Sequence, residues 1–205
     1  MSRILKTIVL ASGNSHKAQE VESWLRTRGL PIKVQTASEF GGMSGCIESA
    51  DSFEGNAKIK VDFLRERVPS DFWVLADDSG LAVDALDGAP GVFSARFAGE
   101  DATDEQNVEL LLERMRKFRS ARQRSGRFVC ALSLSISERG RESFLGECNG
   151  SILSHPRGEN GFGYDPVFLP EGFSKSFAEM KDEEKNRLSH RAKALEGFEE
   201  FLRRT

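Results

Sequence analysis

The chain has 205 residues, of which 39% are hydrophobic and 30% are charged, the composition of an ordinary globular protein. Proteins that bind nucleic acids or acidic membranes without specificity carry a strong positive charge, and the formal net charge of −3 argues against this class. The length suits one α/β domain or two small lobes that share a core, and because no repeat or linker interrupts the sequence, we expect residues 1–205 to form a single domain.

The first part of the chain predicts a strand, a helix, a strand, a loop, a helix and a strand. The strands are expected over residues 4–11, 32–36 and 72–76, where apolar side chains gather. One helix follows the first strand and carries Val21, Trp24 and Leu25 at helical spacing. A loop rich in glycine and serine spans residues 39–52, and Asp51 with Glu54 has the spacing of a capping box for the next helix.

The rest of the chain starts with Asp77-Asp78-Ser79-Gly80, which reads as a turn between the strand over 72–76 and a short strand that begins at Leu81. Thr103 and Gln106 form a capping box for a third helix. Residues 128–136 and 144–152 predict a hairpin. A glycine-rich loop over 157–166 precedes a short strand at 167–169, and the last helix is expected over 183–202.

Residues 114–127 contain seven basic side chains and no acidic one. This run fits a solvated helix end and loop, and the alternative is a patch that binds nucleic acid. With the overall charge negative, we expect no nucleic-acid partner.

The cysteines and the first apolar run bear on the location of the protein. Cys46, Cys130 and Cys148 lack the spacing of metal ligands, and their odd number argues against a disulfide framework. The run Ile8–Ala11 is too short for the core of a signal peptide or for a membrane span. We therefore expect a cytoplasmic protein with no membrane partner.

The segment Ser12-Gly13-Asn14-Ser15-His16-Lys17 lies where the first strand turns into a helix. Backbone N–H groups and the positive end of a helix attract anions, Gly13 lets a phosphate approach, and Asn14 and Lys17 add donors. The alternative is a simple capped helix. The chain contains no GxxxxGK[ST] run, so this corner is not a standard P-loop.

The adjacent carboxylates Asp77 and Asp78 follow an apolar strand, where they repel each other unless a positive group lies nearby. Mg²⁺ is a usual answer, because it takes oxygen ligands and bridges to phosphates. Successive strand residues point to opposite faces, so the two side chains are expected to differ in role. The alternative is a turn in which an aspartate accepts from the backbone of Gly80.

The glycine-rich segment Gly158–Asp165 presents Phe162 between two glycines, which suits stacking on a planar base. Tyr164 could belong to this site, and a tyrosine in the core near a turn is nearly as good an explanation for its presence here. His190 and Arg191 offer donors for a purine edge, or else belong to a surface helix. An anion corner, a carboxylate pair, an aromatic platform and several cations together predict a protein that binds and cleaves a nucleotide.

The residues above belong to motifs that occur in a fixed order. They are Ser12-Gly13-Asn14-x-x-Lys17, Phe53-x-x-Asn56, Ala76-Asp77-Asp78-Ser79-Gly80-Leu81, Gly88-Ala89-Pro90-Gly91, Ser94-Ala95-Arg96, Phe162-Gly163-Tyr164-Asp165-Pro166 and Lys185-Asn186-x-x-Ser189-His190-Arg191. Over about residues 4–200, the sequence resembles the inosine/xanthosine triphosphate pyrophosphatase family. The family usually has threonine in place of Ser12, and either hydroxyl can donate.

The resemblance implies an elongated α/β fold, with a long mixed β-sheet, flanking helices and two lobes around a central substrate cleft, and a homodimer. It implies Mg²⁺-dependent hydrolysis of ITP, dITP and XTP to the monophosphate and pyrophosphate, which cleanses the nucleotide pool. Asp78 is implied as the general base and, with Glu48, as a metal ligand. The implied substrate-binding residues are Ser12, Gly13, Asn14, Lys17, Asn56, Lys60, Ser79, Phe162, Gly163, Tyr164, Asp165, Lys185, His190 and Arg191.

Two other functions stay open at this point. One is a pyrophosphatase for other modified nucleotides, such as pyrimidines. The other is a nucleotide sensor or RNA-binding module without catalysis, and Glu48, Asp77, Asp78 and Lys17 argue against it because a sensor needs no carboxylate to activate water.

Overall fold

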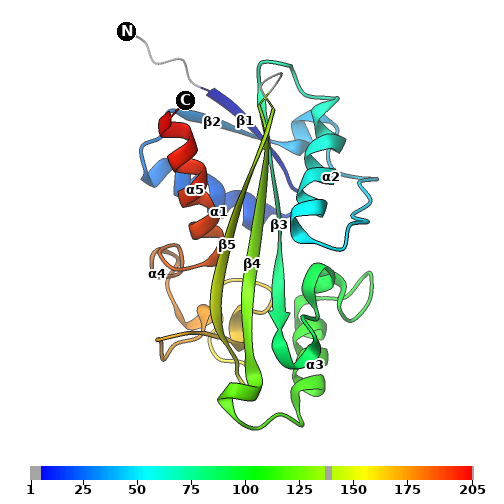
Figure 1. Ribbon diagram of the computed structural model, residues 1–205, viewed down its shortest axis with the longest axis vertical. Coiled ribbons are helices and arrows are strands. Elements are labelled where there is room, and N and C mark those ends of the chain that lie inside the picture. Colours follow the sequence, from blue (N-terminus) through cyan, green and yellow to red (C-terminus); the bar gives the residue numbers. More distant parts are fainter. Residues whose placement is uncertain (1–5, 137–139, 205) are drawn as a thin grey trace. The chain divides into compact units, whose positions relative to one another are not determined.

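The computed structural model describes residues 6–136 and 140–204 (Figure 1). The expected start of the first strand at residue 4 lies outside these residues. In chain order the strands and helices are β1 (Lys6–Ala11), α1 (Ser15–Thr27), β2 (Ile32–Thr36), α2 (Phe53–Arg65), β3 (Trp73–Val83), α3 (Asp104–Met115), β4 (Ser125–Ser135), β5 (Arg141–Ile152), β6 (Phe168–Pro170), α4 (Asp182–Lys185) and α5 (His190–Arg204). Short 3₁₀ helices include Gly91–Arg96 and Asp165–Val167.

The six strands form one sheet in the order β2-β1-β3-β4-β5-β6. β1 runs parallel to both β2 and β3, whereas β5 and β6 are antiparallel. The expected α/β fold with a mixed sheet and flanking helices is therefore confirmed, as is the pairing of β4 with β5. No helix among the described residues is both long and apolar enough to cross a membrane.

The chain divides into two compact units. Within the described residues, unit 1 comprises 6–78, 131–136, 140–145 and 194–204, and unit 2 comprises 79–130 and 146–193. β3, β4 and β5 each contribute residues to both units. The single domain over residues 1–205 and the cleft between two lobes stay predictions.

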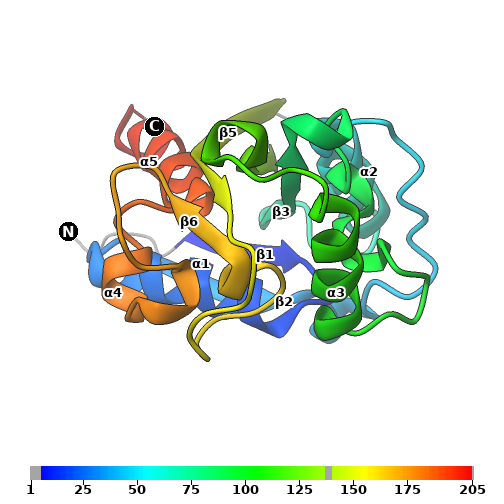
Figure 2. The same ribbon diagram turned by 90° about the horizontal axis from the view of Figure 1, so that it is seen from below.

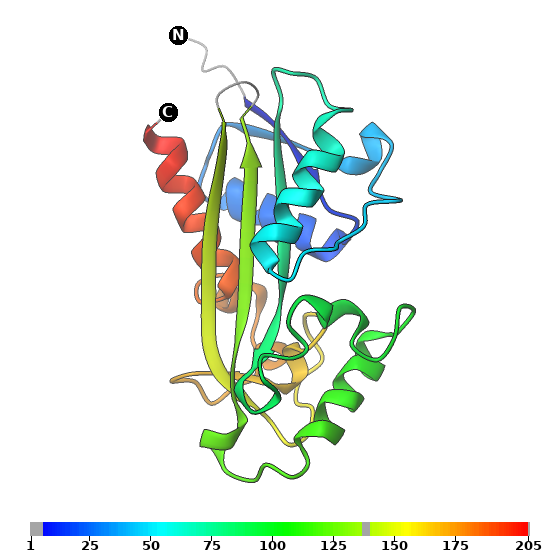
Figure 3. The ribbon, with the colours of Figure 1, turned by 45° about the vertical axis from the view of Figure 1, so that its right-hand side comes forward.

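The core of unit 1 follows from the alternation of side chains along β1 and β3. On one face Val9 and Val74 pack with Val61 and Leu64 of α2. On the other face the side chains of the strands meet α1, and Trp73 packs against Phe201 of α5 with ring centroids 6.1 Å apart. Figure 3 shows α2 and α5 on opposite sides of the sheet.

In the core of unit 2, side chains of α3 pack with side chains of the sheet and of the segments that follow β5. Its buried side chains are Leu81, Val83, Val108, Leu111, Met115, Phe128, Cys148, Ile152, Tyr164, Val167, Phe168, Phe177 and Met180. Two of the three cysteines, Cys130 and Cys148, are buried, and the three are free thiols.

The expected turn at Asp77-Asp78-Ser79-Gly80 is wrong, because β3 runs through it without a break. Gly80 is required for a close approach rather than for a bend. A Cβ at Gly80 would lie 2.3 Å from Oγ of Ser94, the atom that accepts from the N–H of Leu81 at 2.9 Å. The Ser94 hydroxyl thus provides a hydrogen-bond acceptor for the backbone of β3 next to the segment that was predicted to be a turn.

Two other boundaries differ from the prediction. The cap of α2 is Ser52 rather than Asp51, since the Ser52 hydroxyl accepts from the N–H of Gly55. The last helix is interrupted between Lys185 and His190, where Ser189 accepts from the N–H of Ala192 and starts a new helix. The capping box of Thr103 and Gln106 is confirmed.

One residue of the basic run over 114–127 is not solvated, contrary to the prediction of a solvated helix end and loop. Arg124 is buried, and its guanidinium donates to the backbone carbonyls of Met115, Phe118, Ile152 and Leu153. It therefore ties the end of α3 to the end of β5 within unit 2. Arg119 and Arg122 are exposed.

Candidate functional site

Asp77 and Asp78 lie next to each other in β3, and strand alternation turns them to opposite faces of unit 1. Asp77 faces α1, where its Oδ1 lies 2.8 Å from the ammonium of Lys17. Asp78 faces α2, where its Oδ1 lies 2.6 Å from the ammonium of Lys60. Each buried carboxylate therefore has its own lysine, which confirms that the two aspartates differ in environment.

Lys60 also reaches Glu48, whose Oε2 lies 3.0 Å from the same ammonium. Burial alone would lower the pKa of Lys60, but the negative charges of Asp78 and Glu48 raise it above its ordinary value. The Lys60 ammonium thus stays charged and holds two carboxylates of different chain segments together.

Burial raises the pKa of Asp78 above that of an ordinary aspartate, although the positive charges of Lys60 and Lys17 oppose the shift. The second oxygen of Asp78, Oδ2, is buried and has no hydrogen-bond partner among the described residues. A buried acceptor left in this way costs free energy unless a ligand satisfies it.

The oxygen atoms of Glu48 and Asp78 fit a hard divalent cation such as Mg²⁺. No group of three or more His, Cys, Asp or Glu side chains with metal-site geometry occurs within residues 6–136 and 140–204. The two carboxylates are enough to hold such a cation, because Mg²⁺ is commonly bound in proteins through one or two carboxylates.

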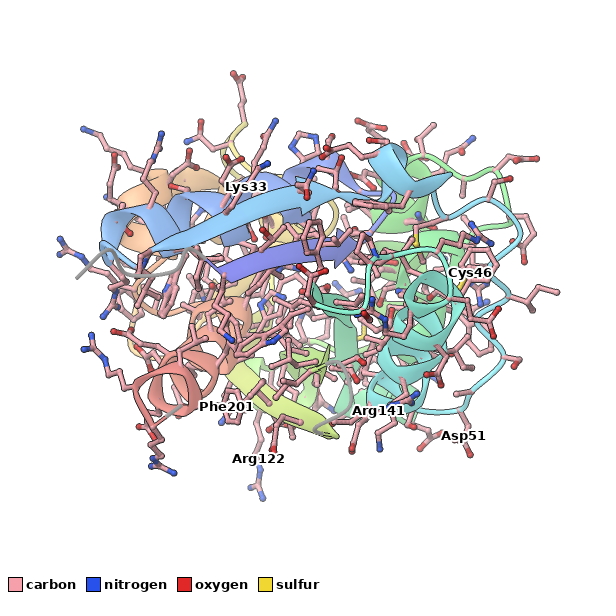
Figure 4. All side chains as sticks on the ribbon, turned by 90° about the horizontal axis from the view of Figure 1, so that it is seen from above. Lys33, Cys46, Asp51, Arg122, Arg141 and Phe201 are labelled. Carbon is pink, nitrogen blue, oxygen red and sulfur yellow. The ribbon has the colours of Figure 1, made fainter. Side chains whose placement is uncertain are left out.

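Asn56 lies one helical turn before Lys60 and is fully buried, with 0% of its surface exposed. Its Oδ1 accepts from the N–H of Ala50 at 2.9 Å. Asn56 therefore positions the loop that carries Glu48, a role that sequence reasoning missed. In Figure 4, Cys46 and Asp51 mark this loop beside α2.

The corner between β1 and α1 contains a capped helix, as the alternative predicted. Oδ1 of Asn14 accepts from the N–H groups of His16 and Lys17, and Oγ of Ser12 accepts from the N–H of Asn14. A side chain at Gly13 would meet no atom within 4 Å, so the space beside its backbone is open. The charge of this corner comes from the Lys17 ammonium and the helix end.

In unit 2, His190 and Arg191 begin α5 and are buried, so the alternative of a surface helix feature is wrong. Arg191 is 2% exposed, and its Nη2 donates to Oγ of Ser79 at 2.9 Å. The His190 ring stacks on Phe128, with centroids 4.8 Å apart and an interplanar angle of 10°. The positions of both side chains are therefore set by packing.

The loop that carries Phe162 is held by a buried ion pair. Oδ2 of Asp165 accepts from the N–H of Phe162 at 3.0 Å and from the ammonium of Lys185 at 2.8 Å. A Cβ at Gly161 would lie 2.1 Å from the same oxygen, which explains the glycine at that position. The ammonium of Lys185 also lies 4.8 Å from the centre of the Phe162 ring, a cation–π contact.

The structure places Tyr164 in the core, as the alternative predicted, and its hydroxyl donates to the carbonyl of Ser94. Burial raises the pKa of Tyr164, as does the negative charge of Asp104. Sequence reasoning missed Asp104, whose Oδ2 accepts from the N–H of Gly163 at 2.7 Å. An acidic residue in the first turn of a helix is ordinary, so no sequence signal pointed to this contact.

The predicted site residues thus form two sets. Unit 1 contains Ser12, Gly13, Asn14, Lys17, Glu48, Asn56, Lys60, Asp77 and Asp78, and unit 2 contains Ser79, Phe162, Gly163, Tyr164, Asp165, Lys185, His190 and Arg191. The first set has Glu48 with the adjacent Asp77 and Asp78, and the lysines Lys17 and Lys60, which suit a polyphosphate and a metal. The second set has the aromatic ring and the buried donors that suit a base.

Comparison with known proteins gives consistent matches along the chain. The sequence pattern of the Ham1 family matches residues 8–201. A dITP/XTP pyrophosphatase of Opitutus terrae is 44% identical over 200 residues, which are 96% of this chain and 98% of that protein. A dITP/XTP pyrophosphatase of Bacillus anthracis is 40% identical over 200 residues, with 97% of this chain and 96% of the relative covered.

Solved structures agree with the sequence matches. A HAM1 protein from Coxiella burnetii has a TM-score of 0.86 and 38% identity, covering 98% of this chain and 100% of its own. The Ham1 protein of Staphylococcus aureus has a TM-score of 0.84 and 36% identity, covering 97% and 98%. Because fold and sequence match over almost the whole length, the chain belongs to the Ham1 family.

Proposed function

We propose that the chain is a nucleoside-triphosphate pyrophosphatase that hydrolyses the nonstandard purine nucleotides dITP, ITP and XTP to the monophosphate and pyrophosphate. The relatives named dITP/XTP pyrophosphatase support the substrate class. The observation that carries the proposal is the buried Asp78 carboxylate, which shares Lys60 with Glu48 and keeps Oδ2 unsatisfied among the described residues. A protein that only sensed nucleotides would need no carboxylate to activate water.

In this proposal the residues of unit 1 handle the triphosphate. Mg²⁺ held by Glu48 and Asp78 would offset the phosphate charge and stabilise the transition state. Oδ2 of Asp78 takes a proton from the water whose oxygen bonds to the α-phosphorus, and the bond from that phosphorus to the bridging oxygen breaks. Lys60 keeps Asp78 in place, while Lys17 adds positive charge for the departing pyrophosphate.

The residues of unit 2 bind the base. The Phe162 ring stacks on the purine, and donors of Arg191 and His190 face the 6-oxo acceptor of hypoxanthine or xanthine. Adenine has an amino group at this position, which leaves buried donors unpaired and weakens binding. The held positions of Arg191 and His190 support this assignment, because donors fixed by packing cannot turn away from a wrong base.

Two further parts of the proposal rest on the family resemblance and the cysteines. A homodimer follows from the resemblance. A cytoplasmic location agrees with three cysteines that form no disulfide.

The function is tested by incubating the protein with dITP and Mg²⁺ in water labelled with ¹⁸O. We expect dIMP and pyrophosphate, with the label in dIMP because water attacks the α-phosphorus. EDTA should stop the reaction, and an excess of Mg²⁺ should restore it. Release of orthophosphate, or label in pyrophosphate, would contradict the cleavage position, and binding of dITP without turnover would favour a sensor.

Arg191→Lys should reduce the preference for dITP over dATP by at least about tenfold, because lysine keeps the charge but lacks the planar donors of arginine. The measurement is the ratio of kcat/KM for the two nucleotides. Arg187→Lys, an exposed arginine in the segment between α4 and α5, is the matched control and should leave the ratio unchanged. Equal losses on dITP and dATP would contradict base reading by Arg191.

A further inference from the structure

The loop around Phe162 is held from two directions within unit 2. The N–H of Phe162 donates to Asp165 inside the loop, and the next N–H, that of Gly163, donates to Asp104 of α3. The peptide groups on either side of the Phe162 Cα are therefore each bound to a carboxylate. The backbone at Phe162 is thereby held at both peptide groups, and the Lys185 ammonium contacts its ring.

Asp104 is not needed for the start of its own helix. Oγ1 of Thr103 accepts from the N–H of Gln106, and Oε1 of Gln106 accepts from the N–H of Thr103. This capping box is complete without the Asp104 carboxylate. Its short bond to Gly163, at 2.7 Å, joins residues that lie 59 positions apart in the sequence.

α3 is a firm support for this contact. Asn107, one turn after Asp104, is buried, and its side chain accepts from the N–H of Ala98 and donates to the carbonyl of Ala95. Val108 and Leu111 of the same helix pack in the core of unit 2. Figure 2 shows α3 in green beside the yellow segment that includes the Phe162 loop.

Gly163 makes the loop dependent on this support. Its φ is +59°, in the left-handed region, and a Cβ there would meet no atom within 4 Å. A glycine adopts many backbone conformations, so the peptide after Phe162 gains freedom once Asp104 stops accepting its N–H. A ring on a mobile backbone stacks on a base only part of the time, which lowers the apparent affinity.

We propose that Asp104 is a positioning residue for base recognition, which holds the Phe162 ring in the orientation that stacks on a purine. The inference rests on the proposed function, since it takes Phe162 as the base platform. Asp104 itself touches the Gly163 backbone and acts on substrate only through that loop.

The test compares three variants of the full chain. Asp104→Ala removes the acceptor. Asp104→Asn keeps an oxygen that can accept from Gly163. Glu105→Ala removes an equal charge from the same turn of α3, and no hydrogen bond joins Glu105 to the loop among those of the described residues.

Amide hydrogen exchange is measured over residues 158–165 in the free protein, and the affinity for IMP is measured by calorimetry. Asp104→Ala should exchange at least about fivefold faster in this segment and bind IMP about tenfold more weakly, the effect of losing one charge-assisted hydrogen bond. Asp104→Asn and Glu105→Ala should stay within about threefold of the parent in both measurements, since one keeps the bond and the other never made it. With dITP, Asp104→Ala should raise KM more than it lowers kcat.

The outcomes separate this inference from the proposed function. If the parent protein binds IMP but does not hydrolyse dITP, the proposed function is wrong. The IMP affinities of the variants then still test the role of Asp104. The inference is overturned if Asp104→Ala binds IMP as tightly as the parent does, if Glu105→Ala weakens binding equally, or if the parent binds no IMP at all.

Discussion

Asp78→Asn is expected to lower kcat/KM for dITP by about a thousandfold while the protein stays folded, the usual scale for the loss of a general base. Asparagine has the shape of aspartate but neither takes a proton from water nor binds a cation as strongly. The fold should persist because Glu48 still accepts from Lys60 and because burial already disfavours the charge of Asp78. Activity is measured as pyrophosphate release, and folding by thermal denaturation.

The control for this variant is Asp62→Asn. Asp62 lies on α2 as Lys60 does, but it is exposed and pairs with Arg141 at the surface, with one contact of 2.8 Å. The same chemical change there should leave kcat/KM unaltered, since exposed ion pairs contribute little. If Asp78→Asn keeps more than a tenth of the parent activity with its fold intact, Asp78 is not the base.

The environments of the two aspartates were predictable because they depend on a short-range rule. Side chains alternate along any strand, so Asp77 and Asp78 were expected to point to opposite faces, although the strand was predicted to end at Ala76 and in fact continues to Val83. The cap at Thr103 was predictable for the same reason, because a capping box is complete within four residues. Local rules of this kind need no knowledge of the rest of the fold.

Several features that were mispredicted or missed depend on tertiary contacts, whereas the cap of α2 was assigned to Asp51 because the neighbouring Ser52 is an equally good acceptor for the first turn. Gly80 resembles a turn residue, and only the approach of Ser94 shows why a strand needs glycine there. Arg124 belongs to a basic run that is typical of a solvated loop, yet it donates to two carbonyls within that run and to the carbonyls of Ile152 and Leu153 far along the chain. The contact of Asp104 with Gly163 is of the same kind. Such partners are chosen by tertiary packing, on which a local pattern carries no information.

Asp165→Asn is expected to lower the free energy of unfolding by about 3 kcal/mol, because it removes one charged member of a buried ion pair. Lys185 is only 5% exposed, and its ammonium lies 2.8 Å from the Asp165 carboxylate. Asparagine can still accept from the N–H of Phe162, so the loss isolates the charge of Asp165 from its backbone contact. Equilibrium unfolding in urea measures the change.

The double variant Asp165→Asn with Lys185→Met separates stability from function. Methionine fills the space of the lysine stem without a charge, so the free energy of unfolding should return to within about 1 kcal/mol of the parent. The cation over the Phe162 ring is then absent, and KM for dITP should be higher than that of the parent although the protein is stable again. If both changes together are no more stable than Asp165→Asn alone, the buried charge of Lys185 is not what destabilises the single variant. If KM of the double variant equals that of the parent, the contact of Lys185 with Phe162 has no part in base binding.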